Sequence, residues 1–390
     1  MKTLVIIFSE TRTSELTFEN IKKNVIDELN ADVCVCIGTK PDYDTNNPFF
    51  KIAKYRFLYP EPEDFGDAFE EEYKELIEKN NNIYEKIENV NTLYGRITPE
   101  INCDNKPENN IHYLGHYDTN DFNFNLIENE NKNKYDEIVF HTKKTPEIGE
   151  EYYGSVYGIQ KTYNNFKTQE GVNTYRKRLY WREFLKVKDQ FLGGIKDEHN
   201  QHLGSAGILI FFRWFLLKQL IQHNLIEKYD RFIITRSDYL YRLPHPRLEL
   251  MNPNYIWIPD EEHYGGFTDR HVVLSKTNIT NYLNIFEKMV IKSNDYFMKM
   301  ININSWNLEK FIKFHLIQEG VEHLVREFPY IMYSVRNING STRWTKGVFS
   351  EKYNYFIKYM TEYNKSNYYK KLHENSGLTI NDFYMKILHR

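Results

Sequence analysis

The fold predicted for this chain is decided by residues 229–271, YDRFIITRSDYLYRLPHPRLELMNPNYIWIPDEEHYGGFTDRH. Two short apolar runs, residues 232–234 and 255–258, each end in a cluster of polar residues. Apolar runs bounded by turn residues are typical of buried strands. Ligands of open α/β sheets bind outside the carboxyl ends of the strands. We therefore expect the residues that follow these two strands to form one site.

The N-terminal segment predicts the start of the same sheet. Residues 3–8 are a near-continuous apolar run, as in a central parallel strand, and they lead into Ser9, Glu10, Thr11 and Arg12. A helical pattern and a second strand at residues 32–37 complete a βαβ unit. The first loop of such a unit is where a Rossmann-like fold binds nucleotide. The glycine-rich fingerprint is absent here, which argues against the dinucleotide-binding version.

The remaining pattern predicts an α/β fold with a mostly parallel sheet flanked by helices and a helical C-terminal region. We expect one domain over residues 1–300, with a polar insertion around residues 60–134. A helical extension over residues 301–390 is expected to pack on it, with helices at residues 308–328 and throughout residues 353–390.

Composition narrows the function classes. The chain has 390 residues, of which 41% are hydrophobic, so a sizeable core is expected. Its formal net charge of −3 lacks the basic excess of proteins that grip nucleic acid. No apolar run is long enough for a signal peptide or a membrane span. We expect a soluble cytoplasmic protein, and Cys34, Cys36 and Cys103 to be reduced thiols.

The acids of the opening stretch suit two kinds of chemistry. Asp238 follows a buried strand among hydroxyl groups, which suits a hard divalent cation such as Mn²⁺ or Mg²⁺; His271 is a weaker candidate ligand. Asp260, Glu261 and Asp269 are candidates for a general base. The alternatives are that Asp238 caps the following turn and that the other acids are ordinary solvated side chains.

Other residues of these loops suit the binding of a phosphorylated ligand. Arg12 and Arg236 are expected at two strand ends of one sheet, where they would neutralise phosphate, or else pair with a neighbouring acid. Gly265 and Gly266 would let the backbone approach a bulky polar substrate. The candidate contacts to a nucleotide and its diphosphate are then Ser9, Thr11, Arg12, Arg236, Ser237, Gly265 and Gly266.

Three segments resemble glycosyltransferases of the GT-A fold that use nucleotide sugars. They are SETR at residues 9–12, FIITRSDYLY at residues 232–241 and IPDEEHYGGFTDRH at residues 258–271. The nearest likeness is to glycosyltransferase-like proteins of large DNA viruses and algae. If the source is viral, the host cytoplasm or the virion is the expected location.

The resemblance implies a nucleotide-sugar donor, a glycan acceptor and a divalent ion held by an Asp-x-Asp element. Here that element is Arg-Ser-Asp, so only Asp238 matches its last acid and Arg236 stands in place of the first. By the same resemblance, Asp269 after the double glycine is the base that activates the acceptor hydroxyl. The alternative belongs to another functional class. It is a catalytically inactive GT-A-like module that binds glycan or assembles with partners. A nucleotidyltransferase is a third reading, but it would normally carry a glycine-rich loop after the first strand.

Overall fold

The computed structural model describes residues 1–79, 92–98, 112–118, 137–142, 192–196, 204–291, 296, 299–300, 305–339 and 345–388. The chain divides into two compact units. The first comprises residues 1–66, 189–287 and 305–390, and the second comprises residues 67–188 and 288–304. The candidate site lies entirely in the first unit.

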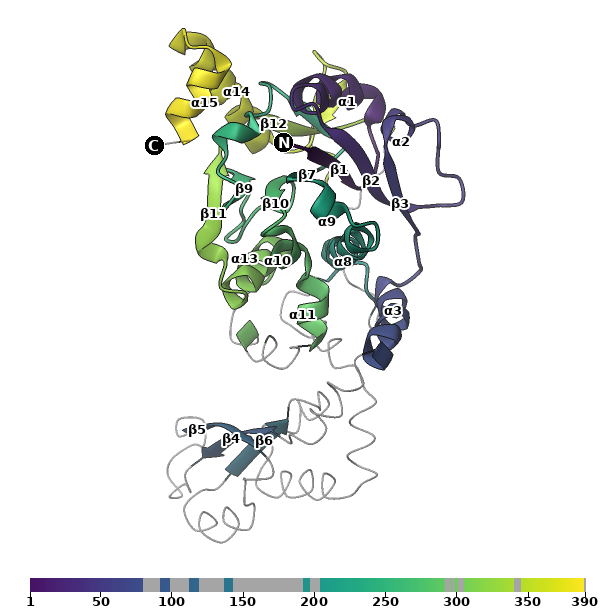
Figure 1. Cartoon of the computed structure of the whole chain (residues 1–390), viewed down its shortest axis with the longest axis vertical. Coiled ribbons are helices and arrows are strands. Elements are labelled where there is room, and N and C mark those ends of the chain that lie inside the picture. Colours follow the sequence, from purple (N-terminus) through teal and green to yellow (C-terminus); the bar gives the residue numbers. More distant parts are fainter. Residues whose placement is uncertain are drawn as a thin grey trace. The chain divides into compact units, whose positions relative to one another are not determined.

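A seven-stranded sheet organises the first unit (Figure 1). Its order is β11 (Val325–Phe328), β9 (Ile256–Pro259), β10 (Val272–Ser275), β7 (Arg231–Thr235), β1 (Thr3–Ser9), β2 (Asp32–Thr39) and β3 (Tyr55–Pro60). All neighbouring strands are parallel except β10, which is antiparallel to both β7 and β9.

Helices cover both faces of this sheet because its central strands are apolar on both sides. Val5 and Ile7 of β1 belong to the core that contains α1 (Ser14–Ile21), the π-helical turn Lys22–Asp27, α2 (Pro48–Ile52) and the C-terminal α15 (Ile380–Leu388). Phe8 faces the other way and meets Phe212 of α8 (Ala206–Gln222) edge to face, with ring centroids 6.4 Å apart. β1 is therefore buried on both faces, as the sequence predicts.

A smaller sheet lies in the same unit. Its order is β13 (Val348–Ser350), β14 (Tyr355–Ile357), β12 (Met332–Arg336) and β8 (Tyr239–Tyr241), all antiparallel. The remaining described helices are α9 (Leu225–Lys228), α10 (Ile279–Leu283), α11 (Ile285–Ile291), α13 (Leu308–Gln318) and α14 (Met360–Ser376). α11 and α3 (Phe65–Lys79) each cross a boundary between the two units.

The second unit contains a three-stranded antiparallel sheet in the order β5 (His112–Asp118), β4 (Thr92–Thr98) and β6 (Glu137–Thr142). Much of the polar insertion predicted around residues 60–134, and Cys103 with it, lies outside the described residues. Cys34 and Cys36 are buried free thiols of β2.

The predicted α/β class, the mostly parallel sheet and the C-terminal helices are confirmed. Two details are wrong. The helix predicted over residues 308–328 ends at Gln318, because Gly320 turns the chain with a φ of 71°, and Val325–Phe328 then joins the sheet beside β9. The tail also begins with a strand, β14, before its helices start at Met360.

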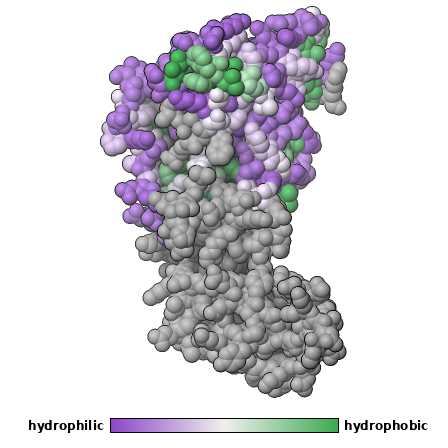
Figure 2. Space-filling model, turned by 180° about the vertical axis from the view of Figure 1, so that it is seen from behind, coloured by the Kyte–Doolittle hydropathy of each residue, from purple (hydrophilic) through white to green (hydrophobic). Residues whose placement is uncertain are grey.

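On the face shown in Figure 2, the surface of the described part is mainly hydrophilic, with hydrophobic residues in a few groups. No helix in the described ranges is both long enough and apolar enough to cross a bilayer.

Candidate functional site

The sheet topology brings several loops to one edge. β2 and β7 flank β1 on opposite sides, so the strand order reverses at β1, which is where α/β folds bind ligands. The loops after β1 and β7 emerge there side by side. Because β10 is antiparallel to β7 and β9, its start lies beside their carboxyl ends, with Val272 opposite Ile234. The segments around Asp238, Asp260 and Asp269 therefore share this edge.

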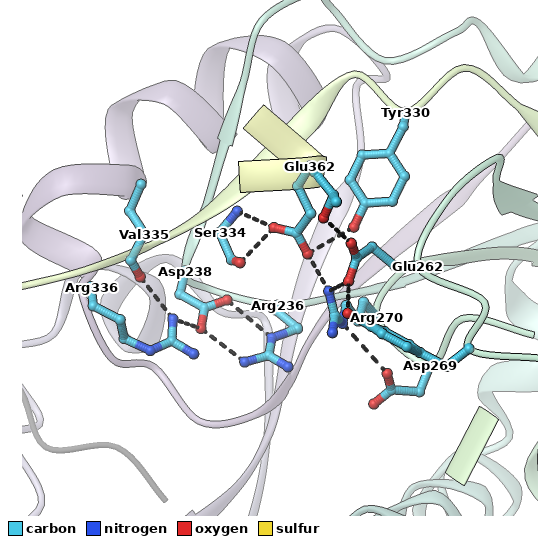
Figure 3. Close-up of polar contacts among 12 residues, drawn as sticks. Arg236, Asp238, Glu262, Asp269, Arg270, Tyr330, Ser334, Val335, Arg336 and Glu362 are labelled. Carbon is cyan, nitrogen blue, oxygen red and sulfur yellow. Dashed lines mark hydrogen bonds and ion pairs between the residues drawn. The ribbon is translucent and has the colours of Figure 1, made fainter. Parts of the chain in front are cut away.

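The charges of three arginines act on Asp238 after β7, and Figure 3 shows two of them, Arg236 and Arg336, bonded to its carboxylate. Arg236 donates to both carboxylate oxygens, through Nε at 3.0 Å and Nη2 at 2.9 Å. Arg336, the last residue of β12, donates to the same carboxylate through Nη1. The charge of Arg12, in the loop after β1, also acts on Asp238. We call these four residues, with Lys358, the cationic cluster.

Backbone contacts fix the positions of these loops. The Ser237 hydroxyl donates to the Arg12 carbonyl oxygen at 2.9 Å, and Thr17 of α1 donates to the Ser237 carbonyl oxygen at 2.5 Å. Thr11 bonds Tyr43 through their hydroxyls at 2.8 Å. Ser237 and Thr11, both predicted ligand contacts, are thus buried. Ser237 joins the loops after β1 and β7, and Thr11 joins the first of these loops to Tyr43, which follows β2. Ser9 is the last residue of β1.

The electrostatics of the cluster favour an anion. Burial alone would raise the pKa of Asp238, but the charges of Arg236 and Arg336 hold it well below its usual range. Desolvation lowers the pKa of Arg12. Glu10, at the more exposed outer side, forms an ion pair with Arg12. Three guanidinium charges thus act on Asp238, and Glu10 pairs with one of them, Arg12. The next carboxylate, that of Asp269, pairs with Arg270 and also acts on Arg236.

Arg336 keeps unused hydrogen-bond donors. Its side chain is 1% exposed, and its Nε and Nη2 have no hydrogen-bond partner among the described residues. A buried donor without a partner costs about 1–3 kcal/mol. Arg213, Arg231 and Arg242 also have side-chain nitrogens without a hydrogen-bond partner. Arg336 differs from them because it lies beside other cationic side chains that could bind the same anion.

These side chains do not fit the divalent ion that the sequence resemblance implies. Such an ion needs carboxylate oxygens as ligands, and both oxygens of Asp238 already accept from guanidinium groups. The three guanidinium charges that act on Asp238 would repel a cation. No group of three acids, histidines or cysteines suited to a metal occurs in the part of the chain that the structure describes.

His271, the second predicted metal ligand, lies elsewhere in the core. Its Nε2 is 3.2 Å from Nε2 of His245, and its Nδ1 is 3.0 Å from the Thr235 hydroxyl. Burial holds the pKa of His271 well below its usual range and lowers that of His245 to about 4, so both rings are neutral at pH 7. No contact of His271 involves Asp238.

A buried acidic network adjoins the cationic cluster (Figure 3). Arg270 forms ion pairs with Glu262, at 2.7 Å, and with Glu362 of α14. Glu362 is fully buried and also accepts from the Tyr330 hydroxyl at 3.0 Å and the Ser334 backbone N–H at 2.6 Å. Glu262 has a left-handed backbone, with a φ of 63°. The network ties the loop before β10 to β12 and α14.

Asp269 lies where the two groups of charges meet. Its carboxylate is 3.8 Å from Nε of Arg270, and its charge also acts on Arg236. Burial, and then the nearby charge of Asp269, raise the pKa of Glu309 in α13 to about 7. A carboxyl group with a pKa near neutrality beside a second carboxyl group is a typical acid–base arrangement. Asp269 is the best-placed base candidate of the predicted three.

Asp260 and Glu261 instead contact α14. Asp260 accepts from the Tyr330 backbone N–H at 2.8 Å and from the Tyr369 hydroxyl, and Lys365 lies 3.3 Å away. Lys365 also pairs with Glu261 at 3.4 Å. These contacts give both acids a role in holding α14 against the sheet edge.

Gly266 brings the loop against α13. A Cβ atom at this position would lie 1.9 Å from the Glu309 carbonyl oxygen, so no other residue fits without movement. The Phe267 N–H donates to that same oxygen at 3.0 Å. Gly265 has a φ of 83°, which favours glycine. The double glycine thus sets the position of Glu309 relative to Asp269.

The sequence analysis did not identify Arg336, Lys358, Glu362, Tyr330 or Glu309 as residues of the site. No local sequence pattern marks Arg336 at the end of β12 or Lys358 after β14. For Glu309 a signal exists, because Asn307 caps α13, accepting from the Lys310 N–H at 2.8 Å, and places an acid in the first turn.

No model of a known protein family matches this chain, and no curated protein matches its sequence significantly.

Proposed function

We propose that this chain is a glycosyltransferase of the GT-A type. It would transfer a hexosyl, deoxyhexosyl or pentosyl group from a nucleotide sugar to a hydroxyl of a glycan acceptor. The observation that carries the proposal is the convergence of Arg12, Arg236 and Arg336 on Asp238 at the reversal of strand order. Guanidinium groups match phosphate oxygens in geometry and charge, and this edge is where α/β folds bind nucleotides.

In this proposal the arginines take the role that a divalent ion has in related enzymes. Arg336 offers two unused donors and Arg236 is the more accessible guanidinium, with its side chain 21% exposed. The bond from the anomeric carbon to the diphosphate oxygen breaks as the acceptor oxygen bonds to that carbon. The leaving diphosphate gains one negative charge, which fixed positive charge stabilises.

Asp269 is the proposed base that accepts the proton of the acceptor hydroxyl. The effect of its charge on Arg236 supports this role, because base and leaving group must flank one anomeric carbon. Glu309, with a pKa of about 7, would keep one proton available beside Asp269 at neutral pH. The competing proposal is a catalytically inactive module that binds glycan. Measured sugar transfer would distinguish the enzyme from this module.

The first test is ligand binding by thermal shift with UDP, GDP, dTDP and their sugars, in EDTA and in Mn²⁺. We expect at least one diphosphate to stabilise the wild type in EDTA. Arg336→Met should remove this stabilisation. Arg247→Met is the matched control, because Arg247 is more than half exposed and faces Glu28. No stabilisation by any nucleotide would reject the proposal, and binding without sugar transfer or donor hydrolysis would favour the inactive module.

A further inference from the structure

Lys358 follows β14 and shares a face of the smaller sheet with Arg336. Val335 opposite Ile357 places both of these apolar side chains in one small core. Because side chains alternate along strands, Ser334, Arg336 and Lys358 belong to the opposite face. The Lys358 N–H donates to the Ser334 carbonyl oxygen at 2.9 Å, which fixes this register. Its Nζ lies over the Tyr359 ring, 4.7 Å from the centroid.

The charges around Lys358 are mostly of its own sign. Arg236, Arg336 and Arg270 act on it, and Asp238 is the acid whose charge opposes theirs. In the described part of the chain, Lys358 has no carboxylate within the 4.0 Å of an ion pair. Burial, and then the charges of Arg236 and Arg336, lower the pKa of Lys358 to about 6. The amine is therefore mainly neutral at pH 7.5 in the free protein.

A bound diphosphate would reverse this balance. With Asp269 counted as the partner of Arg270, the three arginines of the cationic cluster, less Asp238 and Glu10, carry a net charge of +1 while Lys358 is neutral and +2 when it is protonated. The diphosphate of a nucleotide sugar carries two negative charges, so the protonated cluster matches it. An anion within a few ångströms favours the ammonium form.

We propose that Lys358 is a fourth cationic ligand of the diphosphate and takes up one proton when the diphosphate binds. This inference rests on the proposed function. It makes donor binding depend on pH above neutrality, because each diphosphate bound then consumes up to one proton from solution. In that range the affinity falls by up to tenfold for each pH unit, the limit set by linkage to one proton.

The test is calorimetric titration with the best-binding nucleoside diphosphate at pH 7.5, in Hepes and in Tris, whose ionisation enthalpies differ. The slope of the binding enthalpy against the buffer enthalpy gives the number of protons taken up. We expect up to one proton for the wild type, and none for Lys358→Arg, which is always charged. Protons exchanged by the ligand itself are the same for both proteins and cancel in the difference.

The pH dependence provides a second readout. Between pH 7 and 8.5 the affinity of the wild type should fall, while that of Lys358→Arg should stay level and that of Lys358→Met should be low throughout. Lys352→Arg, at an exposed lysine of the same segment, is the control and should behave as the wild type. Equal proton counts and equal pH profiles for the wild type and Lys358→Arg would overturn the inference, yet leave the proposed function standing. If no diphosphate binds at all, both this inference and the proposed function are wrong.

Discussion

Glu362 gives the sharpest test of how the site is assembled. Its carboxylate is fully buried and accepts hydrogen bonds from Arg270, Tyr330 and Ser334, which belong to three different segments. Glu362→Ala leaves the Ser334 N–H without its partner and takes one of three counter-charges from buried Arg270. Removing one member of a buried ion pair costs about 3–5 kcal/mol.

The control lies on the same helix. Glu374 of α14 is more than half exposed and faces Lys370 at 3.7 Å, so Glu374→Ala should change the free energy of unfolding by no more than about 0.5 kcal/mol. Urea denaturation measures both variants. With a slope of about 3 kcal/mol per M, Glu362→Ala should lower the midpoint by roughly 1 M or more. Equal midpoints for the two variants would refute the reasoning that this network holds α14 to the sheet edge.

Three further predictions concern Asp269 and Glu309 of the site and the buried pair of His245 and His271. Asp269→Asn should lower turnover by about 100-fold or more while donor affinity in calorimetry stays the same; normal sugar transfer would show that Asp269 is not the base. Burial raises the folded-state pKa of Glu309 to about 7, above its unfolded value, so the ionised carboxylate destabilises the fold above that pH. Glu309→Gln should therefore raise the melting temperature relative to wild type at pH 8 but much less at pH 5, and an equal shift at both would contradict this. Burial lowers the folded-state pKa of His245 to about 4, so its contribution to stability is complete above about pH 6.5 and is lost as pH falls toward 4. In His245→Gln the melting temperature should fall less between pH 6.5 and 4 than it does in the wild type. An equal fall in both proteins would show that the His245–His271 pair does not cause the loss of stability in acid.

Local patterns were sufficient to predict the core of the fold. The apolar runs of β1, β2, β7 and β9 are short and bounded by turn residues, so their burial can be read without knowledge of their neighbours. The placement of Arg12 and Arg236 at adjacent strand ends followed from the same reading. The strand Val325–Phe328 was missed because it continues a helical pattern, and only its pairing with β9 makes it a strand.

The chemistry of the site was harder to predict from the sequence than the core of the fold. Asp238 was expected to bind a metal because its sequence neighbours are polar, but its strongest distant partner, Arg336, is 98 residues away. That contact depends on the antiparallel register of β8 and β12, which sequence spacing does not encode. His271 was predicted as a ligand from its proximity to Asp269, whereas the start of β10 directs it into the core beside His245.

By itself, the sequence determined which segments are buried strands and which polar residues follow them, because burial and turn formation depend on residues close together in the chain. Only the tertiary structure decided the charge of the site. Arg336, Lys358 and Glu362 reach it through the smaller sheet and α14. Since Coulomb interactions depend on distance in space, these residues turned a predicted metal-binding acid into the counter-ion of an arginine cluster.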